Sequence, residues 1–129
     1  MAQNALSVLE LTPLERDLLE RFHKRYAKYG FPSVGQITVL SRTNTGAGRM
    51  TRLTHDGVFE GDGAEVPLGR FSYLVMEGIE SHAEFSIYVN SNKLSMLEIV
   101  ALLGKWDGVE RPWKVADPDT GECAELEPV

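Results

Sequence analysis

The sequence predicts an α+β fold in which an N-terminal helix packs on a mostly antiparallel sheet of about five strands. Two patterns support this prediction. An apolar residue recurs at every fourth position from Leu14 to Tyr26, which is the spacing of a helix with one buried side. After Gly35 apolar and polar residues alternate, as they do in half-buried strands. Short turns separate these strands, so we expect sequential hairpins with one sheet face left for the helix.

The helix is predicted over residues 13–29. Thr12 and Glu15 form a capping box: the threonine hydroxyl accepts from the Glu15 amide, and the Glu15 carboxylate accepts from the Thr12 amide. Pro13 suits the first helical position because its missing N–H would have no helical partner there. Gly30 suits the left-handed residue that follows a helix.

Five main strands are predicted, over residues 37–41, 49–55, 71–77, 83–89 and 93–101. The segment 56–70 is rich in glycine, which indicates a loop with a short edge piece near residues 58–59 or 65–66. The run from Leu97 to Leu103 would also suit a helix. We prefer a strand because the loop Asn90-Ser91-Asn92 before it favours a hairpin. Residues 109–115 are expected to cross the domain, with Trp106 and Trp113 clamping them to the core.

The chain is expected to form one domain over residues 1–115, followed by an acidic, flexible tail over residues 116–129. That tail holds five acids and no base, whereas the whole chain has a net charge of −6, so the body is about neutral. A body without a basic excess does not favour a nucleic-acid partner. The tail is a solvated segment or, alternatively, a mimic of phosphate for a basic partner.

A cytoplasmic location is expected. Cys123 is the only cysteine, so the chain has no disulfide of its own. The first residues lack the basic segment that opens a signal peptide. No apolar run approaches the length of a membrane span, so no membrane partner is expected.

The stretch from Ser41 to Arg52, SRTNTGAGRMTR, raises the question of an anion site. Glycine loops that hold nucleotide phosphates are followed by a helix, whose amides and dipole bind the anion. Here a strand is predicted next, so a nucleotide loop is not favoured. Two interpretations stay open: a hairpin turn in which glycine supplies a positive φ angle, or an anion-binding patch formed by Arg42, Arg49 and Arg52.

Glu98 is the most informative carboxylate because it interrupts an otherwise apolar strand, and a buried carboxylate needs a partner. Arg42 or Arg49 could supply that partner, as a structural salt bridge, which we favour, or as a ligand site. The candidate ligand-binding residues are Arg42, Gly46, Gly48, Arg49, Glu98 and Trp113.

No catalytic, metal or cofactor site is predicted. The three histidines are too widely spaced to suggest convergent metal ligands (His23, His55 and His82). Cys123 lies among acids, which raise a thiol pKa and suppress its reactivity. Glu84 and Glu98 lie on strands expected to pair, which leaves proton transfer open.

Three segments share short motifs with a known group of proteins: Ser41-Arg42 followed by Thr45-Gly46-Ala47-Gly48, then Leu94-Ser95-Met96-Leu97-Glu98, then Arg111-Pro112-Trp113. In these segments the chain resembles a family of small bacterial proteins of unknown function. The resemblance implies a lone cytosolic domain and no particular activity. The chain departs from the family pattern at Arg49-Met50, where aromatic residues are usual, and at Ser81-His82-Ala83-Glu84, where glycines are usual.

The expected function is therefore non-enzymatic binding of another protein, in the manner of a small immunity or regulatory protein. A second copy of the chain is a further candidate partner, as a homodimer. The alternative is a small anionic-ligand or enzymatic site formed by Arg42, Arg49 and Glu98 beside the glycine loop at 45–48.

Overall fold

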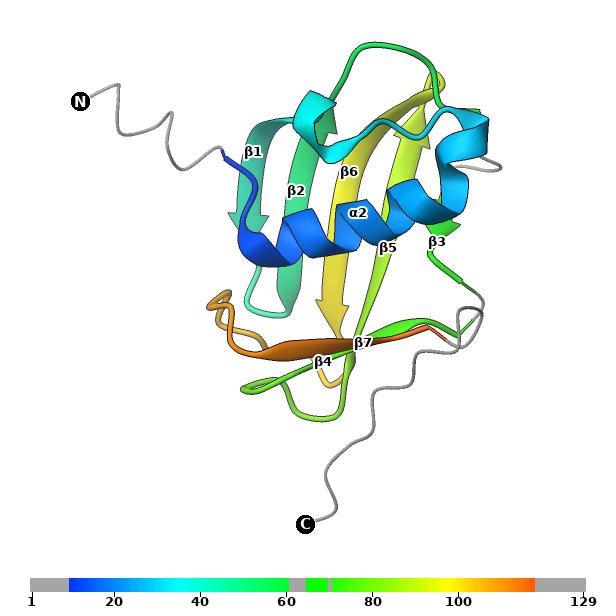
Figure 1. Cartoon of the computed structure of the whole chain (residues 1–129). Coiled ribbons are helices and arrows are strands. Elements are labelled where there is room, and N and C mark those ends of the chain that lie inside the picture. Colours follow the sequence, from blue (N-terminus) through cyan, green and yellow to red (C-terminus); the bar gives the residue numbers. More distant parts are fainter. Residues whose placement is uncertain (1–9, 61–64, 70, 118–129) are drawn as a thin grey trace, which may run out of the picture.

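The computed structural model of the chain describes residues 10–60, 65–69 and 71–117. It confirms the α+β fold: helix α2 (Pro13–Tyr26) lies across one face of a mostly antiparallel sheet (Figure 1). Among the described residues the sheet has seven strands rather than about five. These strands are β1 (Thr38–Asn44), β2 (Gly48–Thr54), β3 (Glu65–Pro67), β4 (Tyr73–Met76), β5 (Ala83–Asn90), β6 (Lys93–Ala101) and β7 (Trp113–Ala116).

The strand order is β1-β2-β6-β5-β4-β7, and the short strand β3 pairs with β5. Hairpins join β1 to β2 and β5 to β6, as predicted. Ser91 and Asn92 turn the second hairpin with φ angles of 53° and 62°. In Figure 1, β4 and β7 pass across the lower end of the other strands. Non-sequential pairs, β2 with β6 and β4 with β7, hold the sheet together.

The predicted capping box begins α2. The Thr12 hydroxyl accepts from the Glu15 amide at 3.1 Å, and the Glu15 carboxylate accepts from the Thr12 amide at 3.0 Å. A 3-10 turn (η1, Ala27–Tyr29) extends the helix to Gly30, whose φ of 95° ends it. A second 3-10 turn (η2, Val34–Gln36) leads into β1. The predicted start and end of the helical segment are both confirmed.

Helix α2 buries its apolar stripe against the sheet. Leu14, Leu18, Leu19 and Phe22 have no exposed surface. Phe22 also meets Phe85 of β5 edge to face, with ring centroids 6.0 Å apart. Full burial of such side chains stabilises a fold by about 1.5–3 kcal/mol each, so this layer holds α2 on the sheet.

The opposite face of the sheet has no described helix over it. Strand alternation sends every second residue of β2, β5 and β6 to that side, and the cross-strand pairs keep these residues in register. We call this surface the open face; it is formed by Met50, Arg52, Glu65, Glu84, Ser86, Tyr88, Met96, Glu98 and Val100.

The C-terminal end of the described chain belongs to the fold. Ala116 closes β7, and Asp117 is 2% exposed. Arg25 donates to the Asp117 carboxylate at 3.1 Å, so the helix holds the end of the described chain. Residues 118–129, with Cys123, lie outside the described residues. In the described part of the chain, no helix has the length and apolar character needed to cross a membrane.

Candidate functional site

Arg42 and Arg49 meet on the helix side of the sheet because of the β1–β2 register. Arg42 lies opposite Thr51, and Asn44 lies opposite Arg49. Residues that face each other across antiparallel strands point to the same side, so these four side chains converge. A register shift between Val39 and Ser41 precedes them in β1. The register therefore brings Arg42 and Arg49 together on the helix side.

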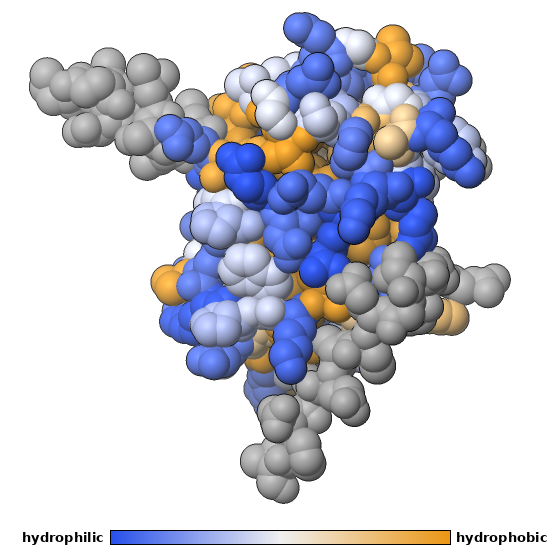
Figure 2. Space-filling model, viewed as in Figure 1, coloured by the Kyte–Doolittle hydropathy of each residue, from blue (hydrophilic) through white to orange (hydrophobic). Residues whose placement is uncertain are grey.

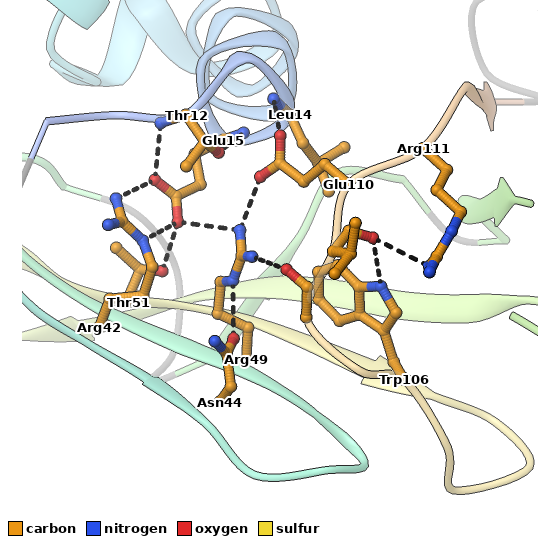
Figure 3. Close-up of polar contacts among 12 residues, drawn as sticks. Thr12, Leu14, Glu15, Arg42, Asn44, Arg49, Thr51, Trp106, Glu110 and Arg111 are labelled. Atoms are coloured by element: carbon orange, nitrogen blue, oxygen red, sulfur yellow. Dashed lines mark hydrogen bonds and ion pairs between the residues drawn. The ribbon is translucent and has the colours of Figure 1, made fainter. Parts of the chain in front are cut away.

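The carboxylate that the arginines share is Glu15 of α2. Arg42 donates two hydrogen bonds to it, from Nε to Oε2 at 2.7 Å and from Nη2 to Oε1 at 2.6 Å (Figure 3). Arg49 Nη1 lies 3.5 Å from Oε2, and the Thr51 hydroxyl donates to the same oxygen at 2.8 Å. Glu15 has no exposed surface. The arginines therefore form a salt bridge with Glu15 of the helix and not with Glu98, the acid favoured from the sequence.

Each nitrogen of the Arg49 guanidinium donates a hydrogen bond, as Figure 3 shows. Its Nη1 donates to Glu110 at 2.6 Å, its Nη2 to the Gly108 carbonyl at 2.5 Å, and its Nε to Asn44 at 3.0 Å. The guanidinium lies 4.8 Å from the ring centroid of Trp106, a cation–π contact. Only 4% of Arg49 is exposed. Through its bonds to Gly108 and Glu110, this arginine joins β2 to the loop between β6 and β7.

The two charges stabilise each other. Burial by itself raises the pKa of Glu15, but hydrogen bonds from Arg42, the Thr12 amide and Thr51 outweigh it and lower that pKa below its usual 4.5. The hydrogen bond to Glu15 raises the pKa of Arg42 above its usual value, against the opposing effect of burial. At neutral pH both groups are charged, so the cluster is an ion pair.

The glycine loop is a turn. The Thr45 hydroxyl accepts from the amides of Ala47 at 3.3 Å and Gly48 at 3.0 Å. Gly46 has a φ of 86°, and its carbonyl accepts from the Trp106 amide at 2.9 Å. These amides are turned inward to Thr45, so the loop lacks the outward row of N–H groups that holds an anion. The hairpin interpretation is confirmed.

Glu98 lies on the open face, and the expectation that it meets Arg42 or Arg49 is wrong. Arg49 pairs with Ile99, so Glu98, one residue earlier, points to the other side of the sheet. Its partner is Tyr88, whose hydroxyl donates to Glu98 at 2.9 Å. That hydrogen bond, with partial burial and the charges of Glu98 and Glu65, raises the pKa of Tyr88 to about 12.

Both tryptophans anchor the C-terminal segment, as expected. Trp106 is 2% exposed, and its indole N–H donates to the Val109 carbonyl at 3.0 Å. Trp113 is half-buried, and its indole N–H donates to Asp17 of α2 at 2.8 Å. Trp113 thus ties β7 to the helix and is a structural clamp in this fold. Arg52 points to the open face, opposite in direction to Arg49.

The histidines are engaged separately. His23 Nδ1 lies 3.0 Å from the Phe31 carbonyl oxygen, and His55 Nε2 accepts from the Leu94 amide at 3.0 Å. The His82 ring lies tilted against that of Tyr73, with ring centroids 4.9 Å apart. Within residues 10–60, 65–69 and 71–117, no three His, Cys, Asp or Glu side chains gather in a way that could hold a metal ion.

A hollow of about 740 Å³ lies on the outer side of α2. Its described lining consists of acidic and basic side chains together with one histidine: Asp17, Glu20, Arg21, His23, Lys24, Arg25 and Asp117. Figure 2 shows this side of the helix as a hydrophilic band. Ion pairs connect Asp17 with Arg21 at 3.2 Å and Arg25 with Asp117 at 3.1 Å. None of the described residues that line this hollow is an apolar residue, whereas small-ligand pockets are lined mainly by hydrophobic and aromatic side chains.

Sequence reasoning missed the two acids of the cluster. Glu15 was assigned to the helix cap alone, although its spacing from Leu18 and Leu19 places it on the buried stripe. A carboxylate at this position is expected to be buried, and a buried carboxylate needs a cationic partner. Glu110 has no comparable signal, because it lies in a loop whose path depends on the burial of Trp106.

No protein-family model matches the sequence, and searches of curated proteins and of solved structures also found no match. The family resemblance noted from the short motifs therefore remains an expectation. The function must be argued from the geometry of this chain.

Proposed function

We propose that the chain is a non-enzymatic binding protein that docks another protein on its open face. One observation supports this above the others. Helix α2 covers one side of the sheet, and the other side, over which no described helix lies, carries methionine, valine and tyrosine side chains among the charged ones. The cytoplasmic, immunity-like or regulatory role expected from the sequence belongs to the same proposal, as does the family resemblance.

The apolar part of the open face runs along β6. Met96 and Val100 alternate there with Glu98, and Met50 of β2 pairs beside them. Val100 is 39% exposed, and Leu102, which continues the alternation beyond the strand end, is 50% exposed. Methionine adapts its shape to a partner, and adjoining exposed apolar residues mark interaction surfaces more often than isolated ones do.

The arginines do not favour the alternative of an anionic-ligand or enzymatic site. Arg42 and Arg49 are compensated by Glu15 and Glu110, and Arg49 is almost fully buried. Glu98, the third member of that alternative, is on the other side of the sheet. An added anion would have to displace a buried carboxylate, which costs several kcal/mol.

Site-specific photo-crosslinking tests the proposal. A photoreactive residue replaces Met96 on the open face or, in a second variant, Glu20 on the exposed side of α2. The proposal expects a discrete protein adduct from position 96 and none from position 20. Adducts from position 20 alone, or repeated recovery of no specific adduct from position 96, would count against it.

The captured protein is then identified, purified and rebound. Val100→Ser should weaken this binding by about tenfold, since loss of the contact of one buried valine costs about 1–1.5 kcal/mol. Val58→Ser is the matched control, because Val58 is 54% exposed in the loop after β2, outside the open face. Equal effects of both changes would argue against docking on the open face.

A further inference from the structure

We infer that the partner of the open face contacts it through a basic segment. This inference rests on the proposed function and specifies the chemistry of the partner. The open face presents apolar side chains along β6. Glu98 interrupts them on the same strand, and Glu84 of β5 and Glu65 of β3 lie to one side of them. A complementary occupant offers lysine or arginine between apolar residues.

The charges of the open face are predominantly negative. Glu65, Glu84 and Glu98 carry three negative charges. Arg52 carries a positive charge, and Lys93, which pairs with Asn90 at the end of this face, carries another and donates to the His55 and Gly57 carbonyls at 3.1 and 2.8 Å. Glu65 and Glu84 are exposed and Glu98 is half-buried. These carboxylates lie on three different strands, β6, β5 and β3, so they are spread over one side of the surface and do not form a single chelating cluster.

Glu98 lies in the middle of the open face, on its central strand β6. It lies between Met50 of β2 and Ser86 of β5 in one cross-strand row. Tyr88 donates to Glu98 at 2.9 Å, and Ser86 donates to Glu65 at 2.8 Å, so both carboxylates are held in place. The raised pKa of Tyr88 follows from the same two negative charges. A cation that reached Glu98 would meet a carboxylate with a fixed position.

On the outer side of helix α2, positively charged side chains outnumber negatively charged ones. The exposed charged side chains of α2 and η1 are Arg16, Glu20, Lys24 and Lys28, three bases against one acid. Positive charge therefore lies on the helix side, while negative charge lies on the open face. A basic segment would be repelled from the first and attracted to the second, which steers it to the sheet.

A second copy of this chain fits the open face less well. A two-fold dimer brings the same patch of each copy together. An axis through the middle of the open face would place Glu98 opposite Glu98 of the second copy, and opposed like charges in an interface are costly. The geometry thus favours a different, basic protein over a face-to-face homodimer.

Two defined peptides test the inference. Each has about ten residues in an extended alternating pattern, one of lysine with valine and the other of glutamate with valine. Backbone amide shifts in NMR map where each peptide binds. The inference expects the lysine peptide to shift amides of β2, β5 and β6, with weaker binding at higher salt. Shifts confined to α2, or equally tight binding of the glutamate peptide, would overturn it.

Two triple variants with the same net charge separate local from overall electrostatics. The first neutralises the open face (Glu65→Gln, Glu84→Gln and Glu98→Gln), and glutamine retains the acceptors for Ser86 and Tyr88. The second neutralises exposed acids elsewhere (Glu20→Gln, Glu60→Gln and Glu80→Gln). Binding of the lysine peptide should fall about tenfold in the first variant and less than about twofold in the second. An equal loss in both would refute a localised basic site.

The natural partner distinguishes the two proposals. If crosslinking at position 96 yields a protein whose reconstituted affinity falls in the first triple variant but not in the second, both proposals are supported. If that affinity is the same in both variants, the open face is still the docking surface, and the basic segment is wrong. Self-association through the open face without any partner would overturn the basic segment in favour of a second copy.

Discussion

Replacement of Glu15 by glutamine tests whether the buried cluster holds the helix on the sheet. Glutamine at the third helical position still completes a capping box, so Glu15→Gln removes the charge and leaves the cap. Arg42 then loses the carboxylate that it grips at 2.6 and 2.7 Å. Breaking a buried ion pair by removing one partner costs about 3–5 kcal/mol. We expect about 3 kcal/mol, because Arg49 keeps Glu110.

The assay is urea unfolding followed by tryptophan fluorescence, with thermal unfolding beside it. A loss of about 3 kcal/mol lowers the melting temperature by roughly 10–15 °C in a chain of this size. Glu20→Gln is the control; Glu20 is an exposed glutamate of the same helix, so the expected change is below about 0.5 kcal/mol. A loss under about 1 kcal/mol for Glu15→Gln would refute the view that the cluster carries structural stability.

The pH dependence gives a second readout of the same pair. The pKa of Glu15 is lowered in the folded state from its usual 4.5, so its contribution is complete above pH 4.5 and is lost as pH falls through the folded value. The difference in unfolding free energy between the wild type and Glu15→Gln should therefore shrink in acid. A difference that stays constant through that window would contradict the ionised pair.

Three further outcomes follow from the structure. Gly48→Ala should lower the free energy of unfolding in urea by about 2–3 kcal/mol, because an added Cβ would collide with the Ile99 carbonyl oxygen of β6. Gly35→Ala is the control and should leave that free energy nearly unchanged, because no atom lies within 4 Å of an added Cβ there. Glu110→Gln should cost about 1–3 kcal/mol, because it weakens a charged hydrogen bond of 2.6 Å; no loss would show that Glu15 alone suffices. Ultraviolet titration should give Tyr88 a pKa of about 12 that falls toward 10 in Glu98→Gln, and an unchanged value would exclude Glu98 as the cause.

The elements with strong local patterns were predictable. The four-residue spacing and the capping box placed α2, and the alternation placed β5 and β6 with their hairpin. The short strand β7 was expected only as a crossing segment, because it becomes a strand by pairing with β4, about forty residues earlier in the chain. Pairings between distant segments leave little trace in local sequence.

Only part of the Glu15–Arg42–Arg49 cluster could be predicted, because the cluster also depends on pairings between distant segments. The meeting of Arg42 and Arg49 follows from a hairpin register, which local sequence indicates. The choice of acid depends on which face each strand residue takes, and a shift of one residue reverses that face. Glu98 was assigned to the wrong side because only the observed pairing of Arg49 with Ile99 defines it.

The double role of Glu15 has a consequence for how the molecule opens. Helix ends usually fray, and their amides exchange with solvent without wider unfolding. The first turn of α2 differs, because the carboxylate that caps Thr12 is also bound by Arg42 of β1 and Thr51 of β2. Opening this turn would leave a buried guanidinium without its anion. The first turn and the β1–β2 hairpin should therefore behave as one cooperative unit, with hydrogen-exchange protection rising and falling together.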